Sequence, residues 1–241
     1  FDARNNPYKT STPYFKTLES AQWSTVTRDY LGRVTSGVKP DNTKTTACYD
    51  LRSVARIDEN GHLNRQIMNG LGLVAEVNEF TGAHTDCSSI PATPYARTYY
   101  SYDISGQLTG VTDAKQNVTS INYDTLGRKK VNSDPDMGVW NYTYYPNGLL
   151  ETTTDAKGQT ITYYYDELNR IITKHYPSGP DVVYTYDEST SSNPKGRLTK
   201  MTDSSGQTVY DYDPMGRITG KTVTINGTAY PRLSFGYLNG R

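Results

Sequence analysis

Two side chains suited to nucleophilic catalysis lie close together in a proline-containing segment, residues 79–98. The thiol of Cys87 follows the imidazole of His84 by three residues. A thiol nucleophile needs a positioned base and an oxyanion hole, and this irregular segment shows no pattern for either. The other histidines, His62 and His175, stand alone, without the HxxxH or CxxC spacing of metal ligands. We therefore expect no catalytic residue, no metal and no cofactor, and we predict that the chain is not an enzyme.

A pair of carboxylates, Asp134 and Asp136, raises the alternative of a calcium site. An EF-hand loop has ligands at alternating positions and a bidentate Glu at its end, and this stretch lacks that pattern. Aspartate at the first position of a four-residue turn accepts hydrogen bonds from backbone N–H groups two or three residues on. The sequence therefore favours turn formation over calcium binding.

Arginines recur directly after the glycine or asparagine of a turn. They are Arg33, Arg128, Arg170, Arg197 and Arg217. Each guanidinium has two structural uses, because it can pair with a turn aspartate or lie on a tyrosine ring. A row of Arg, Asn and exposed Tyr would also suit the hydroxyls and C–H faces of a sugar. We favour the structural interpretation and keep carbohydrate binding as the alternative.

The elements that carry these residues are copies of one unit. Tyr-Asp pairs and the glycine or asparagine three residues after each pair recur at intervals of 21 residues, with Tyr144-Tyr145 in one slot, and a second series of aspartates has the same interval. A fixed period of this length indicates a repeat architecture. The residues assigned to the structural repeat are Tyr102, Asp103, Gly106, Asp113, Tyr123, Asp124, Gly127, Arg128, Tyr144, Gly148, Asp155, Tyr165, Asp166, Asn169, Tyr186, Asp187, Tyr212, Asp213, Gly216 and Arg217.

Each repeat is predicted to be one β-hairpin. It contains two Asp-initiated turns, and the segments between them, such as residues 118–123 and 160–165, are rich in Tyr, Thr, Val and Ile. About 200 residues with one strand per ~10 residues give about 20 strands, whereas open twisted sheets rarely exceed about 10. We therefore predict an all-β fold of tandem antiparallel β-hairpins that coil into a curved spiral or shell segment.

The repeat pattern also predicts the organisation of the chain. Residues 1–28 form an extended lead-in, and residues 29–98 hold degenerate repeats with the irregular insertion 79–98. Residues 99–241 hold regular repeats with a small insertion at 188–195. The role of the larger insertion stays open. So does the pairing of Cys48 and Cys87, which either form one disulfide or remain two unpaired thiols.

Composition excludes several classes of partner. The charges of the 25 basic and 25 acidic residues cancel, so the chain has no net positive charge to attract nucleic acid or an anionic membrane. No apolar run approaches the roughly 20 residues of a membrane helix. The chain has 22 Tyr but only 4 Phe and 2 Trp, so tyrosine takes the place of the usual apolar core residues.

The unit Tyr-Asp-x-x-Gly-Arg, followed by an aliphatic residue and then by Asp-x-x-Gly, resembles the YD repeats of the Rhs family. Residues 123–128 and 212–218 match it well, and the resemblance covers residues 29–241. That family includes bacterial Rhs toxins, the B and C components of insecticidal toxin complexes, wall-associated proteins and teneurins. The resemblance implies a β-strip that spirals into a hollow shell, which in the toxin members encloses a toxin domain.

The resemblance also limits the expected chemistry. The self-cleavage motif of those toxins runs Asp-Pro-x-Gly-Leu, whereas here Asp213-Pro214-Met215-Gly216 is followed by Arg217. No protease aspartate is therefore assigned, and no toxin domain is expected within the chain.

Our leading hypothesis is a non-catalytic shell segment of a larger bacterial protein, secreted or at the cell surface. Its partners would be the rest of its own larger chain, or a shell-forming partner, and an enclosed toxin or effector polypeptide. The alternative is a cell-surface carbohydrate-binding or adhesion module.

Overall fold

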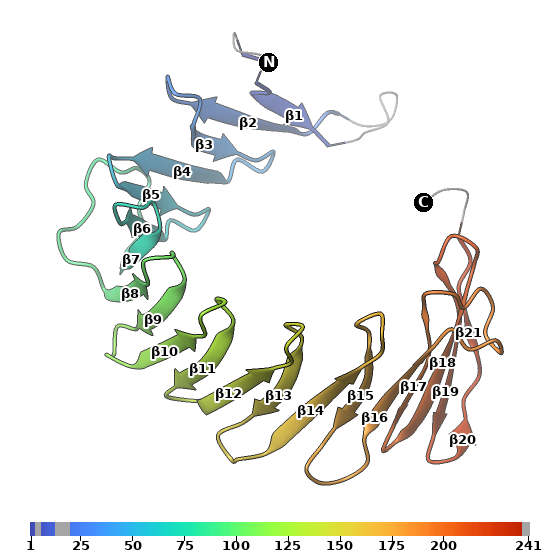
Figure 1. The fold of residues 1–241 in the computed structure, drawn as a ribbon. Helices are drawn as coiled ribbons and strands as arrows, with labels where there is room; N and C mark the ends of the chain where they lie inside the picture. The colour runs from blue at the N-terminus through green and yellow to red at the C-terminus, as the bar shows by residue number, and fades with distance from the viewer. Residues whose placement is uncertain (3–5, 13–19, 238–241) are drawn as a thin grey trace. The chain divides into compact units, whose positions relative to one another are not determined.

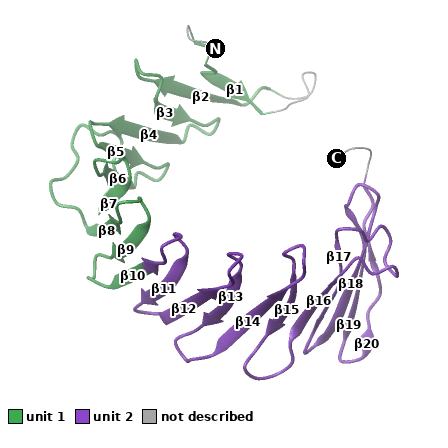
Figure 2. Ribbon diagram, in the orientation of Figure 1, with its two compact units in different colours: residues 1–121 green, residues 122–241 purple. Residues whose placement is uncertain are grey.

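Strands make up all the regular structure in the described part of the chain. The structure is a computed structural model that describes residues 1–2, 6–12 and 20–237. Within these residues lie 21 β-strands (Figure 1), and every recorded pairing between consecutive strands is antiparallel. The predicted fold class, tandem antiparallel hairpins, is confirmed. The chain divides into two compact units, residues 1–121 and 122–241 (Figure 2), which are described separately.

The first unit is an antiparallel meander in which neighbours in sequence pair with one another. Strand β2 pairs with both β1 and β3, although β1 and β2 fall within the segment expected as a lead-in. Its strands are β1 Lys9–Ser11, β2 Trp23–Arg28, β3 Val34–Val38, β4 Lys44–Tyr49, β5 Ser53–Ile57, β6 Leu63–Met68, β7 Val74–Phe80, β8 Ala96–Tyr102, β9 Leu108–Thr112 and the first part of β10 Val118–Tyr123.

The second unit repeats the same plan. Each strand from β11 to β18 pairs with the next, and β19 pairs with β18, β20 and β21. After the last residues of β10, its strands are β11 Lys129–Asp134, β12 Gly138–Tyr144, β13 Leu150–Thr154, β14 Thr160–Tyr165, β15 Ile171–His175, β16 Val182–Tyr186, β17 Leu198–Asp203, β18 Gly206–Tyr212, β19 Ile218–Ile225, β20 Thr228–Ala229 and β21 Leu233–Ser234.

Strands rich in Thr, Tyr, Val and Ile end where the sequence places Asp and, three residues later, Gly or Asn. The turn between β10 and β11 has Gly127 at φ 78, and the turn between β14 and β15 has Asn169 at φ 62. Positive φ is strained for most side chains and is tolerated by Gly and Asn. The alternation of strand formers and turn residues therefore explains the 21-residue hairpin.

A β-bulge accompanies the tyrosine in five of the strand pairings of this chain. Between β12 and β13 the partner of Thr143 is Thr152 but the partner of Tyr144 is Leu150, so one residue of β13 is skipped. The register shifts in the same way before Tyr102, Tyr165, Tyr186 and Tyr212. A bulge bends a strand and redirects its side chains. It recurs here at the residue that contacts the preceding turn.

The two units bury different kinds of side chain. In the first unit, Ala55, Ile57, Leu63 and Phe80 on β5, β6 and β7 form an apolar cluster, which we call the β5–β7 cluster. In the described part of the second unit, the buried polar side chains are Thr153, Ser191, Thr199 and Thr208. Its tyrosines are mostly half-buried, so threonine and tyrosine there cover the sheet in place of large aliphatic residues.

Candidate functional site

The candidate site is a set of contacts that recurs at the turns of the hairpins, and each set includes the aspartate at the start of a turn. In the turn between β10 and β11, one carboxylate oxygen of Asp124 accepts the backbone N–H groups of Leu126 and Arg128, both at 2.9 Å. The main chain closes the same turn, because Gly127 N–H donates to the Asp124 carbonyl and Asp124 N–H donates to the Arg128 carbonyl. The other carboxylate oxygen remains for the arginine side chain.

The arginine joins this turn to a tyrosine of the next hairpin. Arg128 Nε donates to Asp124 Oδ2 at 2.7 Å, and its guanidinium carbon lies 4.4 Å from the centre of the Tyr144 ring. The Tyr144 hydroxyl then donates to the carbonyl of Lys129 at 2.7 Å. We call this arrangement, with Asp and Arg in one turn and a later Tyr whose ring lies against the Arg, the Asp–Arg–Tyr clamp; here the Tyr is 16 residues after the Arg.

The clamp recurs along the chain with nearly constant geometry. The arginine-to-ring distance is 4.3 or 4.4 Å in every set that contains all three residues. The fourth set is longer in sequence, because β20 and β21 lie between its Arg and its Tyr. The sets are Asp29–Arg33–Tyr49, Asp124–Arg128–Tyr144, Asp166–Arg170–Tyr186 and Asp213–Arg217–Tyr237.

The tyrosine hydroxyl bond is also made where the turn has no arginine after its glycine. Tyr165 donates to the Leu150 carbonyl at 2.9 Å, and Tyr102 donates to the Val74 carbonyl at 2.8 Å. In the turn that precedes Leu150, Tyr145 replaces the aspartate and packs edge-on against Tyr165, with ring centres 6.2 Å apart. The hydrogen bond from the tyrosine hydroxyl to the strand after the previous turn therefore occurs in more hairpins than the Asp–Arg ion pair does.

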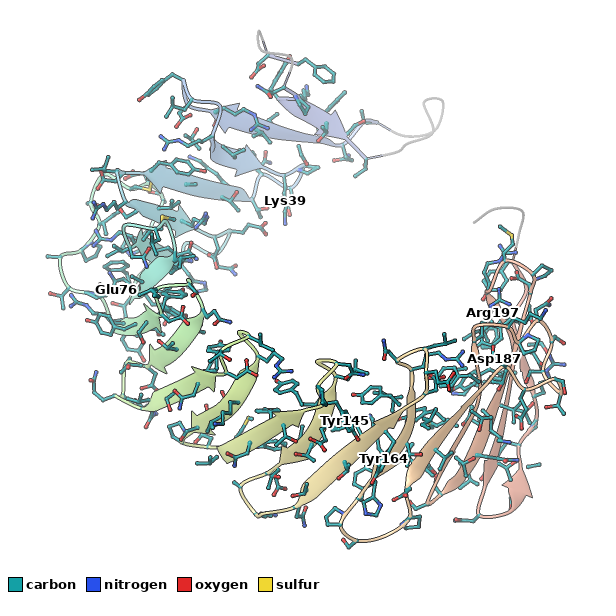
Figure 3. All side chains as sticks on the ribbon, viewed as in Figure 1. Lys39, Glu76, Tyr145, Tyr164, Asp187 and Arg197 are labelled. Atoms are coloured by element: carbon teal, nitrogen blue, oxygen red, sulfur yellow. A yellow bond between two sulfur atoms is a disulfide. The ribbon has the colours of Figure 1, made fainter. Side chains whose placement is uncertain are left out.

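The insertion at 188–195 modifies one copy. Asp187 adopts φ 61, and its carboxylate accepts a hydrogen bond from Arg170 at 2.8 Å. Its backbone N–H donates to the carbonyl of Arg197, which lies beside it in Figure 3. Arg197 remains near the Tyr212 ring at 5.5 Å, and Tyr212 donates to the Leu198 carbonyl. The inserted residues thus leave the tyrosine link in place.

The second series of aspartates lies in the turns at the other ends of the strands. Asp113 accepts the N–H groups of Lys115 and Asn117, and Asp155 accepts those of Lys157 and Gln159. The remaining predicted repeat residues lie in the turns and strand ends of the same pattern. Gly106, Gly148 and Gly216 have positive φ, Asp103 caps the turn that contains Gly106, and Tyr123 ends β10.

Hydrogen bonds and burial shift the acidity of the clamp groups. The backbone N–H of Arg128, and then its guanidinium, hold the pKa of the Asp124 carboxyl below its ordinary value of 3.8. The backbone N–H of Arg170 likewise lowers the pKa of Asp166. Burial raises the pKa of the Tyr144 and Tyr186 hydroxyls, which stay neutral and able to donate. These two clamps are therefore formed by an ionised aspartate and a neutral tyrosine.

Acid is expected to weaken the second unit through these carboxyls. The pKa of Asp124 is lower in the folded than in the unfolded chain, so its stabilising effect is complete above the unfolded value and is lost as the pH falls through the folded value. The free energy of unfolding, measured in urea between about pH 5 and about pH 2, should decrease with falling pH. Asp124→Asn should flatten this dependence; an unchanged slope would contradict the assignment.

The candidate catalytic pair is not a free thiol beside an imidazole. Cys87 forms a disulfide with Cys48, and His84 Nε2 lies 3.2 Å from the Thr81 carbonyl. Asp134 accepts the backbone N–H groups of Asp136 and Met137, as expected of a turn. Residues 1–2, 6–12 and 20–237 contain no group of three His, Cys, Asp or Glu side chains placed to hold a metal. They also contain no helix long and apolar enough to span a membrane.

Three features of the site went beyond the sequence analysis. The two structural uses considered for the arginines are both realised by the same side chain, because Arg128 contacts Asp124 and Tyr144 together. The spacing of 16 residues from the Arg to a later tyrosine is the sequence signal that could have predicted this joint contact. The recurrent bulge had no signal in composition, and the pairing of the two cysteines had been left open.

Comparison with known proteins identifies the repeat. The RHS Repeat family model matches residues 144–181 and 193–229, which contain three of the hydroxyl-linked tyrosines described above, Tyr144, Tyr165 and Tyr212. The resemblance to the YD repeats of the Rhs family is thereby confirmed. No curated protein sequence matches the chain.

Several solved structures share the fold. The crystal structure of TcdB2-TccC3-TEV is 16% identical, with a TM-score of 0.72 over 99% of this chain and 13% of that chain. TcdB2-TccC3-Cdc42 gives 16% identity and a TM-score of 0.71 over 98% of this chain and 13% of that chain. A Tc holotoxin pore of Photorhabdus luminescens is 16% identical, with a TM-score of 0.55 over 83% of this chain and 12% of that chain. The chain thus spans only a small part of the length of the structures it resembles.

Proposed function

We propose that this chain is a structural, non-catalytic segment of a YD-repeat shell, part of a larger secreted or cell-surface bacterial protein. In this role it encloses a toxin or effector polypeptide. The observation that carries the proposal is the Asp–Arg–Tyr clamp. Its Asp and Arg are paired within one turn, and its tyrosine is bonded back to that turn, so the groups that could contact a ligand are engaged within the protein.

The similarity to the Tc structures supports the same role. The fold extends over 99% of this chain but accounts for 13% of the TcdB2-TccC3-TEV chain, as expected of one stretch of a larger repeat array. The net charge of zero gives no attraction to nucleic acid. Its partners are accordingly the rest of the same shell and the polypeptide inside it.

Protease protection in the full-length parent protein tests this function. The enclosed polypeptide should resist digestion in the unmodified parent and in a Tyr164→Ala control, which alters a side chain that is 46% exposed. Paired clamp substitutions, Tyr144→Ala with Tyr186→Ala, should speed its digestion by at least about tenfold. A parent protein in which no polypeptide is protected would overturn the proposal.

A glycan-binding screen tests the carbohydrate-binding alternative. The guanidinium of Arg170 is held by Asp166, Asp187 and the Tyr186 ring, so these groups are engaged within the protein. We expect no sugar to bind at millimolar concentration. Saturable binding that is lost on replacing Arg170 would favour the adhesion module instead.

A further inference from the structure

The insertion between β7 and β8 lies over one face of the first unit and has few attachments. Residues 81–95 make two backbone hydrogen bonds to the sheet region: His84 N–H donates to the Gly61 carbonyl at 2.9 Å, and Tyr95 N–H donates to the Glu79 carbonyl at 2.7 Å. The disulfide links Cys87 to Cys48 of β4. Cys87 and Ile90 pack against the β5–β7 cluster, whereas most other side chains of the insertion are exposed.

Non-covalent attachment of this segment is weak for its length. Fixing each backbone residue costs conformational entropy. Apart from the disulfide, the 15 residues are attached to the sheet region by two backbone hydrogen bonds and by the packing of Ile90. The sheet face under the insertion also buries polar side-chain atoms without hydrogen-bond partners, which costs free energy of folding. Asn78 is 2% exposed, and its Oδ1 has no hydrogen-bond partner among the described residues; nor does the buried Nε of Arg65, which lies opposite Asn78 in the ladder.

The sheet beneath has its own stabilising contacts. Thr46 pairs with Ile57, Ile57 with Leu63, and Leu63 with Phe80, in continuous antiparallel ladders. Ala55 completes the buried cluster, and none of its four members lies in residues 81–95. Loss of the insertion would therefore expose this face without unpairing the strands.

We propose that the Cys48–Cys87 disulfide is a redox latch that holds residues 81–95 on the β5–β7 cluster and releases them when it is reduced. A dithiol reductant supplies the two electrons: its thiolate attacks one sulfur, and the S–S bond breaks through a mixed disulfide. The reductant leaves as its cyclic disulfide, and Cys48 and Cys87 become thiols with two protons. Reduction thus uncovers Ile57, Leu63 and Phe80 at a defined site. This inference does not depend on the proposed function.

Hydrogen exchange read by mass spectrometry tests the latch. In the oxidised chain, peptides covering 81–95 should be protected, because the amides of His84 and Tyr95 donate to carbonyls. With dithiothreitol, exchange in these peptides should rise at least about tenfold, while peptides from β5 and β6 change by less than about twofold. Alkylation should then label both cysteines.

The double variant Cys48→Ser with Cys87→Ser is the matched control. Its exchange over 81–95 should equal that of the reduced chain and should not respond to dithiothreitol. Unchanged protection after reduction would show that packing alone holds the insertion and would overturn the proposal. A simultaneous loss of protection in β5 and β6 would also overturn it, because the disulfide would then maintain the whole fold of the unit.

Discussion

Replacing Tyr186 by alanine is expected to lower the free energy of unfolding of the second unit by about 2–3 kcal/mol. The substitution removes the ring on which the Arg170 guanidinium lies at 4.3 Å and the hydroxyl that donates to Ile171 at 3.1 Å. A partly desolvated cation–π contact contributes about 1 kcal/mol and a hydrogen bond about 1 kcal/mol. Lost packing of a half-buried ring accounts for the rest.

Two further variants separate these contributions. Tyr186→Phe keeps the ring and removes the hydroxyl, and should cost about 1 kcal/mol. Tyr164→Ala, directly before Tyr165 on β14, removes a tyrosine that is 46% exposed and should cost less than about 1 kcal/mol. Urea unfolding followed by far-UV circular dichroism measures all three. Equal losses for Tyr186→Ala and Tyr164→Ala would show that the clamp adds nothing to ordinary strand packing.

Gly206→Ala is expected to be at least as damaging, with a loss of about 3 kcal/mol or more. Gly206 begins β18 at φ 149, a conformation available in practice only to glycine. An added Cβ would overlap the carbonyl oxygen of Thr224 and lie 2.9 Å from its carbonyl carbon. Thr224 belongs to β19, whose ladder with β18 pairs Gly206 with Ile225, so the strand cannot move away without breaking that pairing.

Gly148→Ala provides the comparison for this prediction. Gly148 also has positive φ, at 90, but a Cβ there would meet no atom within 4 Å. It should therefore show the conformational cost alone, about 1–2 kcal/mol. Thermal and urea unfolding of both variants measure the difference. Similar losses in the two proteins would mean that the β18–β19 ladder relaxes around the added methyl group.

Local chemistry made most of the hairpin predictable from sequence. Asp-x-x-Gly fixes a turn through the side chain of one residue and the backbone freedom of another, so each turn can be read from four letters, as at Asp124 and Gly127. The strands between follow from their composition. The chemistry of the guanidinium anticipated the two structural uses of Arg128, as alternatives.

Features that depend on tertiary packing were less accessible. The bulge at Tyr144 is a shift in the pairing of β12 with β13, and the strand-like composition of the two segments does not by itself predict it. The apolar cluster lies in the degenerate repeats at Ile57 and Leu63, where the sequence signature is weakest, because there the insertion supplies a second layer. The disulfide partner of Cys87 depends on where the insertion folds against the sheet, and the spacing of the repeats does not predict that position.

In each clamp the tyrosine bonds to a turn that precedes it in the sequence, so during synthesis the turn is made before the residue that bonds to it. Arg170 and Asp166 leave the ribosome before Tyr186, so their turn waits for the next hairpin before its carbonyl at Ile171 is bonded. Each hairpin that has such a link is thus bonded by the one translated after it, and until that tyrosine is made the carbonyl stays without this partner. Pausing of translation while the tyrosine is still inside the ribosomal exit tunnel would prolong that interval, whereas a pause after the tyrosine has emerged would not.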